Sequence, residues 1–166
     1  GYGNGALHFD AFAKDVLGWF NNTNNFLDFL DARSSVEIVR NGSYTLRPLE
    51  NSTGVRMAKI KFLSKNTFPY YIEYRQGTGF DSDLKKQEFS DNKYGVFVSW
   101  VPKKERLFSR LLDMRPNSNV DNWEDQKIVS LNNTWTTNSL YDFGRGIQIT
   151  QKNKGNDNKA TFEVNF

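Results

Sequence analysis

The sequence predicts a mainly β fold, an antiparallel, jelly-roll-like β-sandwich of about nine strands with an N-terminal α-helix packed on it. From residue 35 onward, apolar and polar residues alternate with a period of two, which is typical of strands with one buried face. Turn-forming residues interrupt this pattern at short intervals, as in antiparallel sandwiches. Aromatic residues make up 15% of the 166-residue chain, so side chains for one hydrophobic core are plentiful.

The predicted helix and a docking segment occupy residues 1–33, and the sandwich domain occupies residues 34–166. Apolar residues recur at helical spacing in the first segment: Phe9, Phe12, Ala13, Val16, Leu17 and Phe20. Asn4 is the expected N-cap, and Gly18 is the expected stop. Trp19 follows directly, where it can dock the helix on the sandwich.

The period of two begins with two short segments, 36–40 and 43–47, on either side of Asn41-Gly42. Asn-Gly favours the type I′ turn of a tight hairpin, because both residues tolerate positive φ. The sequence therefore predicts that these segments pair as a hairpin. Further strands are expected at 55–62, 70–75, 95–101, 107–114, 126–131, 146–152 and 160–166.

The chain contains one histidine, His8, and no cysteine. A catalytic zinc site draws several ligands from His, Cys, Asp and Glu, and one imidazole hardly supplies such a set. We therefore expect the chain to be non-catalytic by itself and His8 to be structural. An independent hydrolase that uses His8 is the less favoured alternative.

Charge and hydropathy argue against two classes of partner. The net charge is +3, and the lysine doublets Lys85-Lys86 and Lys103-Lys104 are isolated, so the sequence does not predict nucleic-acid binding. No apolar run approaches the about 20 residues of a membrane-spanning helix. We therefore expect neither a nucleic-acid partner nor a membrane span.

Four Asn-x-Ser/Thr sequons favour an extracellular, secreted location. Their asparagines are Asn21, Asn41, Asn51 and Asn132. Each falls where a turn or loop is expected, as N-glycosylation requires. An Asn-rich chain also produces such triplets by chance, so their glycosylation is left open.

Glu73 and Arg75 are the first candidate site. They share one face of a predicted strand with Tyr71, while Tyr70, Ile72 and Tyr74 take the other face. If both faces of the sheet are covered, the two charged groups need partners, since an unpaired buried charge is costly. Asp113, among apolar neighbours, is the expected partner of Arg75 in a structural ion pair. A ligand site is the alternative.

Two further candidates lie in predicted loops. Asp81, Asp83 and Asp91 supply several oxygens to one loop, which suits calcium, although a solvated loop is the favoured interpretation. Trp123 and Trp135 have polar neighbours and are candidates for stacking on sugar rings. Packing over the ends of the sandwich is the more usual role of such residues.

Five blocks of sequence, in this order, resemble a known family. They are His8 to Trp19, Gly42 to Leu46 with Pro48 to Glu50, Tyr70 to Arg75 with Gly79 to Asp81, Gly95 to Val98, and Leu111 to Ser118. They are similar to stretches of secreted zinc metallopeptidases of the gametolysin and immune-inhibitor-A-like group. The family's zinc-binding His-Glu-x-x-His-x-x-Gly-x-x-His helix and its methionine turn are absent from this sequence, so no catalytic residue carries over. His8 matches a position outside the family's ligand set.

The resemblance implies a non-catalytic β-sandwich region that lies C-terminal to a catalytic domain. Residues 1–33 would continue from that domain, and zinc is expected only there. The implied role is to support the protease domain or to present substrate. The expected partners are the upstream catalytic domain or a sister chain, and an extracellular protein or glycan. The alternative is a structural or carbohydrate-binding glycoprotein module without protease activity.

Overall fold

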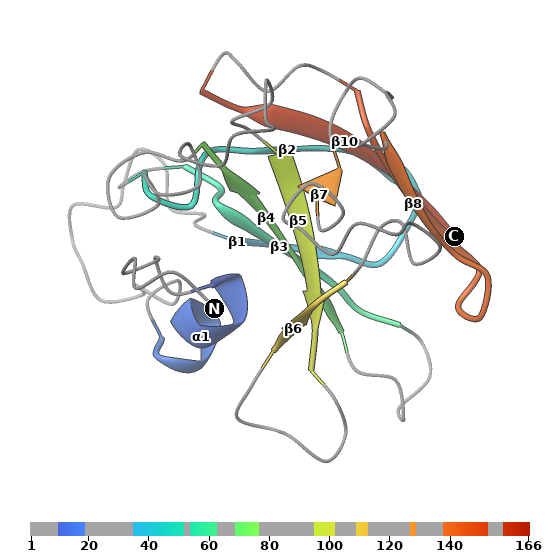
Figure 1. Cartoon of the computed structure of the whole chain (residues 1–166), viewed down its shortest axis with the longest axis horizontal. Coiled ribbons are helices and arrows are strands. Elements are labelled where there is room, and N and C mark those ends of the chain that lie inside the picture. Colours follow the sequence, from blue (N-terminus) through green and yellow to red (C-terminus); the bar gives the residue numbers. More distant parts are fainter. Residues whose placement is uncertain are drawn as a thin grey trace, which may run out of the picture.

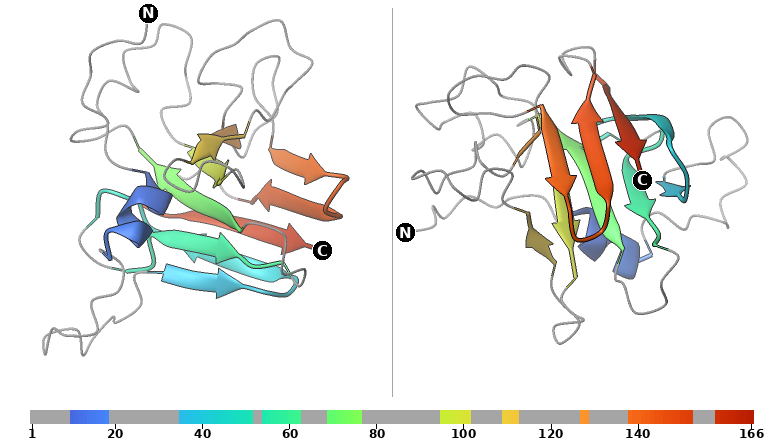
Figure 2. Two further views of the ribbon diagram at one scale, coloured as in Figure 1. Left: turned by 90° about the horizontal axis from the view of Figure 1, so that it is seen from below. Right: turned by 90° about the vertical axis from the view of Figure 1, so that its right-hand side faces the viewer.

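The computed structural model describes residues 10–18, 35–51, 54–62, 69–76, 95–101, 109–112, 127–128, 138–152 and 158–166. These residues form two β-sheets packed face to face, with one short helix against the outer side of one sheet (Figures 1 and 2). The predicted fold class, a mainly β sandwich with a helix packed on it, is confirmed.

The first sheet has the strand order β1-β3-β4-β5-β6, and β7 also pairs with β5. Its strands are β1 (Ser35–Ile38), β3 (Met57–Ile60), β4 (Tyr70–Arg75), β5 (Gly95–Trp100), β6 (Arg110–Leu111) and β7 (Lys127–Ile128). Strand β1 runs parallel to β3, whereas the other pairs are antiparallel. The strand β4 keeps the predicted bounds, and it lies at the centre of the sheet.

The second sheet has the order β2-β10-β9-β8, and all its pairs are antiparallel. Its strands are β2 (Gly42–Leu46), β8 (Ser139–Asp142), β9 (Ile147–Gln151) and β10 (Ala160–Asn165). The described residues thus contain ten strands, and β8 is the one that the sequence did not predict. Only Leu140 of β8 is buried, so the alternation of apolar and polar residues along this strand is too short to be recognised in the sequence.

The predicted hairpin at Asn41-Gly42 is wrong. Strand β1 pairs with β3 in the first sheet, and β2 pairs with β10 in the second, so the chain crosses between sheets here. Neither Asn41 nor Gly42 has the positive φ that a type I′ turn needs. Ile38 and Leu46 are both completely buried in the core between the sheets. A hairpin with a two-residue turn at Asn41-Gly42 would point these two side chains to opposite faces of one sheet, so it could not bury both in this core.

The main core lies between the two sheets. Its fully buried members include Ile38, Leu46, Ile60, Ile72, Tyr74, Val98, Ile147, Ile149, Phe162 and Val164. Each large side chain removed from water stabilises the fold by about 1.5–3 kcal/mol. Tyr70, Ile72 and Tyr74 all face this core, as their alternation along β4 predicted.

Helix α1 (Ala11–Val16) is shorter than predicted. Its N-cap is Asp10, whose Oδ1 accepts a hydrogen bond from the Ala13 N–H at 2.8 Å, so the prediction of Asn4 as N-cap is wrong. Gly18, with φ +74°, follows the helix, which confirms the predicted stop. None of the helices among the described residues has the length and apolar character needed to cross a membrane.

The predicted apolar stripe of the helix is only partly buried. Ala11 and Phe12 are buried, but Val16 and Leu17 are 64% and 54% exposed. A helix of this length meets the flat sheet through one turn, so residues near its end extend beyond the contact. Phe9, Trp19 and Phe20 lie outside the described residues.

Candidate functional site: the helix on the outer face of the first sheet

The outer face of the first sheet is covered by helix α1 and by the chain around Leu49. A second apolar cluster forms there from Ala11, Phe12, Leu49, Met57, Tyr71 and Val101. The ring of Phe12 meets the ring of Tyr71 edge to face, with centroids 5.4 Å apart. Both faces of the sheet are therefore buried around β4, and its charged residues are enclosed.

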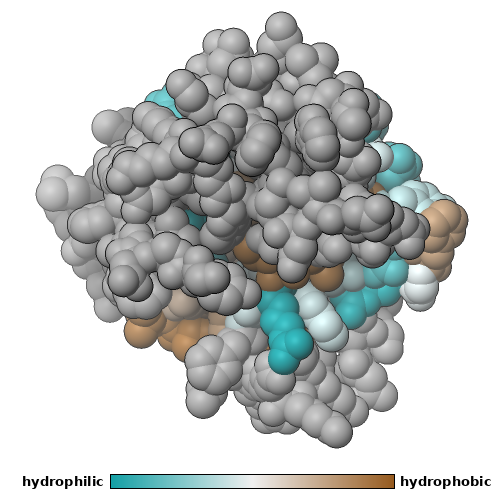
Figure 3. All heavy atoms as spheres, viewed as in Figure 1, coloured by the Kyte–Doolittle hydropathy of each residue, from teal (hydrophilic) through white to brown (hydrophobic). Residues whose placement is uncertain are grey.

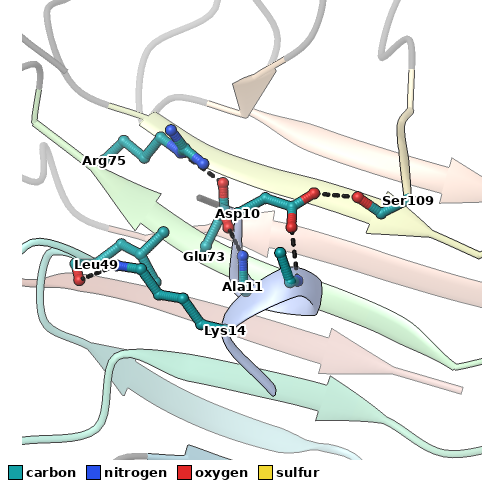
Figure 4. A network of polar contacts seen from close by, with 8 residues as sticks. Asp10, Ala11, Lys14, Leu49, Glu73, Arg75 and Ser109 are labelled. Carbon is teal, nitrogen blue, oxygen red and sulfur yellow. Dashed lines mark hydrogen bonds and ion pairs between the residues drawn. The ribbon is translucent and has the colours of Figure 1, made fainter. Parts of the chain in front are cut away.

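Glu73 joins this sheet to the helix. Its side chain is 2% exposed, and Oε1 accepts a hydrogen bond from Nε of Arg75 at 2.5 Å. Its other oxygen, Oε2, accepts the backbone N–H of Ala11 at 2.5 Å (Figure 4). The two charged residues of β4 are thus paired with each other. The predicted third member, Asp113, lies outside the described residues and stays a prediction.

Burial raises the pKa of the Glu73 carboxyl above its ordinary value. The positive charge of Arg75 and the hydrogen bonds from Arg75 and Ala11 act in the opposite direction, and the nearby Asp10 adds to the rise. A raised pKa in a cleft would suggest a general acid. Here the carboxyl is enclosed and both oxygens are bonded, so its geometry fits a structural role.

Asp10 and Lys14 extend the network from the helix in two directions. Oδ2 of Asp10 accepts a hydrogen bond from the Ser109 hydroxyl beyond β5. Nζ of Lys14 donates to the carbonyl oxygen of Leu49 at 3.1 Å, and the Lys14 side chain is buried (Figure 4). Burial lowers the pKa of Lys14, while the charge of Glu73 opposes that change.

Asp15 makes a second polar attachment at the other end of the helix. Its Oδ2 lies 3.0 Å from Nζ of Lys59 and accepts a hydrogen bond from the Tyr71 hydroxyl at 3.2 Å. Burial alone would lower the pKa of Lys59, but the contacts with Tyr71 and Asp15 raise it overall. The helix is therefore held at both ends by charged hydrogen bonds and in the middle by Phe12.

The polar contacts of Asp10, Lys14, Asp15 and Glu73 hold helix α1 on the first sheet. Within the described ranges, no group of three or more His, Cys, Asp or Glu side chains is placed to hold a metal ion. The carboxylates of Asp10, Asp15 and Glu73 each accept hydrogen bonds from helix or sheet. Sequence reasoning identified Glu73 and Arg75 but missed Asp10, although an Asp three residues before Ala13 is a recognisable N-cap signal.

A second polar cluster joins the two sheets and was also missed. The hydroxyl of Tyr70 in β4 donates to Oδ2 of Asp142 in β8, 72 residues away. Burial raises the pKa of this hydroxyl, and the bond to Asp142 raises it further. The guanidinium carbon of Arg145 lies 4.3 Å from the centroid of the Tyr70 ring and 5.1 Å from that of Phe62.

Two of the four predicted glycosylation sites are described. Asn41 is exposed at the crossing between β1 and β2, and its Oδ1 accepts the backbone N–H of Phe166 at 2.8 Å. Asn51 is half-buried in a turn after β2, and its carbonyl oxygen accepts a hydrogen bond from Arg56. Both asparagines lie outside regular strands, but their glycosylation stays a prediction.

The other predicted site residues lie outside the described residues, and their roles stay predictions. They are His8, Asn21, Asp81, Asp83, Asp91, Asp113, Trp123, Asn132 and Trp135. The candidate calcium loop and the candidate sugar-stacking tryptophans are among them.

Comparison with protein-family models, with curated proteins and with solved structures found no match to this chain.

Proposed function

We propose that this chain is a non-catalytic β-sandwich portion of an extracellular metallopeptidase-like protein, in which helix α1 is the rigid joint to an upstream catalytic domain. In this role the sandwich supports the protease domain or presents substrate to it. The proposal rests on the order of the five sequence blocks and on one structural observation, namely that three of these blocks meet at the helix.

Named residues of the first three sequence blocks contact one another at helix α1. The first supplies Ala11 and Lys14, the second supplies Leu49, and the third supplies Glu73 and Arg75. Lys14 bonds the Leu49 carbonyl, the Leu49 N–H donates to the Tyr74 carbonyl at 2.8 Å, and Glu73 bonds Ala11. Residues that carry the resemblance therefore supply several of the contacts that fix the helix on the sheet, as a rigid joint requires.

The free side of the helix supports the same proposal. Val16 and Leu17 are among the most exposed apolar side chains of the described residues. Figure 3 shows apolar residues at the lower left, where α1 lies in Figure 1. Adjacent exposed apolar groups favour a protein contact. An upstream domain that rests on the joint would cover them.

The first test is the parent polypeptide of the native source. An antibody raised against this chain should capture a secreted protein whose peptides include a zinc-binding His-Glu-x-x-His segment N-terminal to this sequence. Metal analysis of the captured protein should find zinc. A native polypeptide that begins near Gly1, or a longer one without that segment, would overturn the proposal and favour the alternative, a structural or sugar-binding module.

The second test addresses the joint in the full-length parent. The double variant Val16→Asp, Leu17→Asp should lower the thermal midpoint of the catalytic domain, because it places charge in the proposed contact. The matched control is Val39→Asp, which changes a valine that is 59% exposed and lies outside the helix, directly after β1. Equal behaviour of the double variant and the control would contradict the assigned joint.

A further inference from the structure

We propose that the β8–β9 turn and the adjoining outer face of the second sheet bind a neutral sugar chain, with Phe143 and Tyr141 as the stacking surface. This inference does not depend on the proposed protease-associated role, because it concerns the opposite side of the sandwich from helix α1.

The two aromatic rings are exposed together. Phe143 is 85% exposed and Tyr141 is 50% exposed, and their ring centroids lie 4.1 Å apart in an edge-to-face arrangement with an interplanar angle of 65°, so each ring is a separate stacking face. Figure 3 shows apolar residues beside hydrophilic ones at the right-hand edge, where this turn projects in Figure 1. The C–H face of a pyranose ring is apolar and stacks on such rings, while its hydroxyl groups stay available for hydrogen bonds.

The turn that begins beside Tyr141 and carries Phe143 is held by hydrogen bonds to Asp142. Oδ1 of Asp142 accepts the backbone N–H groups of Gly144 at 2.9 Å and Arg145 at 3.2 Å. Oδ2 accepts the Tyr70 hydroxyl, which fixes the turn to the first sheet. A surface arranged before the ligand arrives loses little conformational freedom on binding.

The sheet beside the turn offers hydroxyl and amide groups. Tyr141 is directly opposite Gln148 on β9, and Gln148 is directly opposite Asn165 on β10. This row crosses two strand spacings, about 10 Å, which accommodates more than one sugar ring. The same face carries the hydroxyls of Ser43 and Thr150, and those of Thr45 and Thr161, which bond each other at 3.0 Å. Such groups both donate and accept hydrogen bonds, as sugar hydroxyls do.

Several charges near this face are paired, which favours a neutral ligand over an acidic one. Glu163 lies 2.5 Å from Nζ of Lys152. Asp142 is bonded within the turn, and the guanidinium of Arg145 lies against the rings of Tyr70 and Phe62. The right-hand view of Figure 2 shows β8, β9 and β10 toward the viewer, with no described element in front of them.

Affinity electrophoresis and pull-down assays test the site. The probes are four neutral polysaccharides (cellulose, chitin, laminarin and mannan), the acidic polysaccharide alginate, and phosphatidylcholine vesicles. At least one neutral polysaccharide should bind the wild-type chain. Phe143→Ala should weaken that binding about tenfold. Gln148→Ala should weaken it less, and the exposed control Val39→Ala should leave it unchanged.

Several outcomes would overturn the proposal. These are no binding to any neutral polysaccharide, binding to alginate alone, and binding that Phe143→Ala and Val39→Ala affect equally. Vesicle binding that depends on Phe143 without sugar binding would assign the turn to a membrane surface instead. Because Phe143 is so exposed, its replacement should not change the thermal midpoint, and Gln148→Ala gives a second variant of the same surface.

Discussion

Oε2 of Glu73 accepts a hydrogen bond from the backbone N–H of Ala11 at 2.5 Å, although the two residues are 62 positions apart. The bond satisfies one of the free N–H groups at the start of helix α1 and places a carboxylate near the positive end of the helix. Arg75 approaches the same carboxylate from the strand. One buried side chain thus links the central strand to the helix that covers it.

Glu73→Ala should lower the free energy of unfolding by about 3–5 kcal/mol, because it takes the carboxylate away from a buried guanidinium and from Ala11. Urea denaturation measures the change. The control is Glu37→Ala, which removes a strand carboxylate 2.6 Å from Lys61, where both side chains are at least half exposed. That pair should contribute less than about 1 kcal/mol. Equal losses in the two variants would contradict the structural role of Glu73.

Phe12→Ala should detach the helix before the sandwich unfolds. It removes the ring that packs on Tyr71 and should cost about 3 kcal/mol, at the lower end of the range for buried phenylalanines. Hydrogen exchange should accelerate at the amides of helix α1 more than at those of β9. Val16→Ala changes a residue that is 64% exposed on the same helix and should alter stability by less than about 0.5 kcal/mol. Unchanged exchange in Phe12→Ala would rule out this contact as the helix anchor.

The stability of the fold should depend on pH through Glu73. The folded state raises the pKa of this carboxyl above 4.5, so at pH values between 4.5 and the raised pKa the folded state binds more protons than the unfolded state. Stability from this group is complete below pH 4.5 and is lost as the pH rises through the folded pKa. As the pH rises, the free energy of unfolding of the wild type should therefore fall relative to that of Glu73→Gln, which has no carboxyl to ionise at this position. Parallel pH curves for the two proteins would refute the raised pKa.

Tyr70→Phe should weaken the contact between the two sheets. It removes the hydroxyl that bonds Asp142 and leaves a half-buried carboxylate with one partner fewer, at a cost of about 1–3 kcal/mol. Thermal denaturation measures the loss. Tyr44→Phe is the matched control, because the Tyr44 hydroxyl bonds the carbonyl of Arg40 at an exposed position and should contribute little. A loss in Tyr44→Phe as large as in Tyr70→Phe would refute this assignment.

The local elements follow from the sequence because their signals are local. Alternation along residues 70–75 assigned each side chain of β4 to its face, and Gly18 marked the end of the helix. The need for partners at Glu73 and Arg75 also followed, since two covered faces leave no water for their charges. These inferences use only the period of the strand and the cost of buried charge. The sequence named Asp113 as the partner of Arg75, however, and only the structure shows Arg75 bonded to Glu73.

Pairing between distant segments was decided by the tertiary structure. In a two-residue hairpin at Asn41-Gly42, Ile38 would lie opposite Thr45, so Ile38 and Leu46 would point to opposite faces of one sheet. Strands in opposite sheets allow both side chains to be buried in the core between the sheets. The bonds from Glu73 to Ala11 and from Tyr70 to Asp142 likewise join residues that no short window contains. The sequence by itself determined which face of each strand is apolar, because that property belongs to consecutive side chains. The pairing of strands and the hydrogen bonds between distant residues were determined only by the tertiary structure. When the chain encloses one core, each buried polar group must find its hydrogen-bond partner among the residues that burial brings next to it.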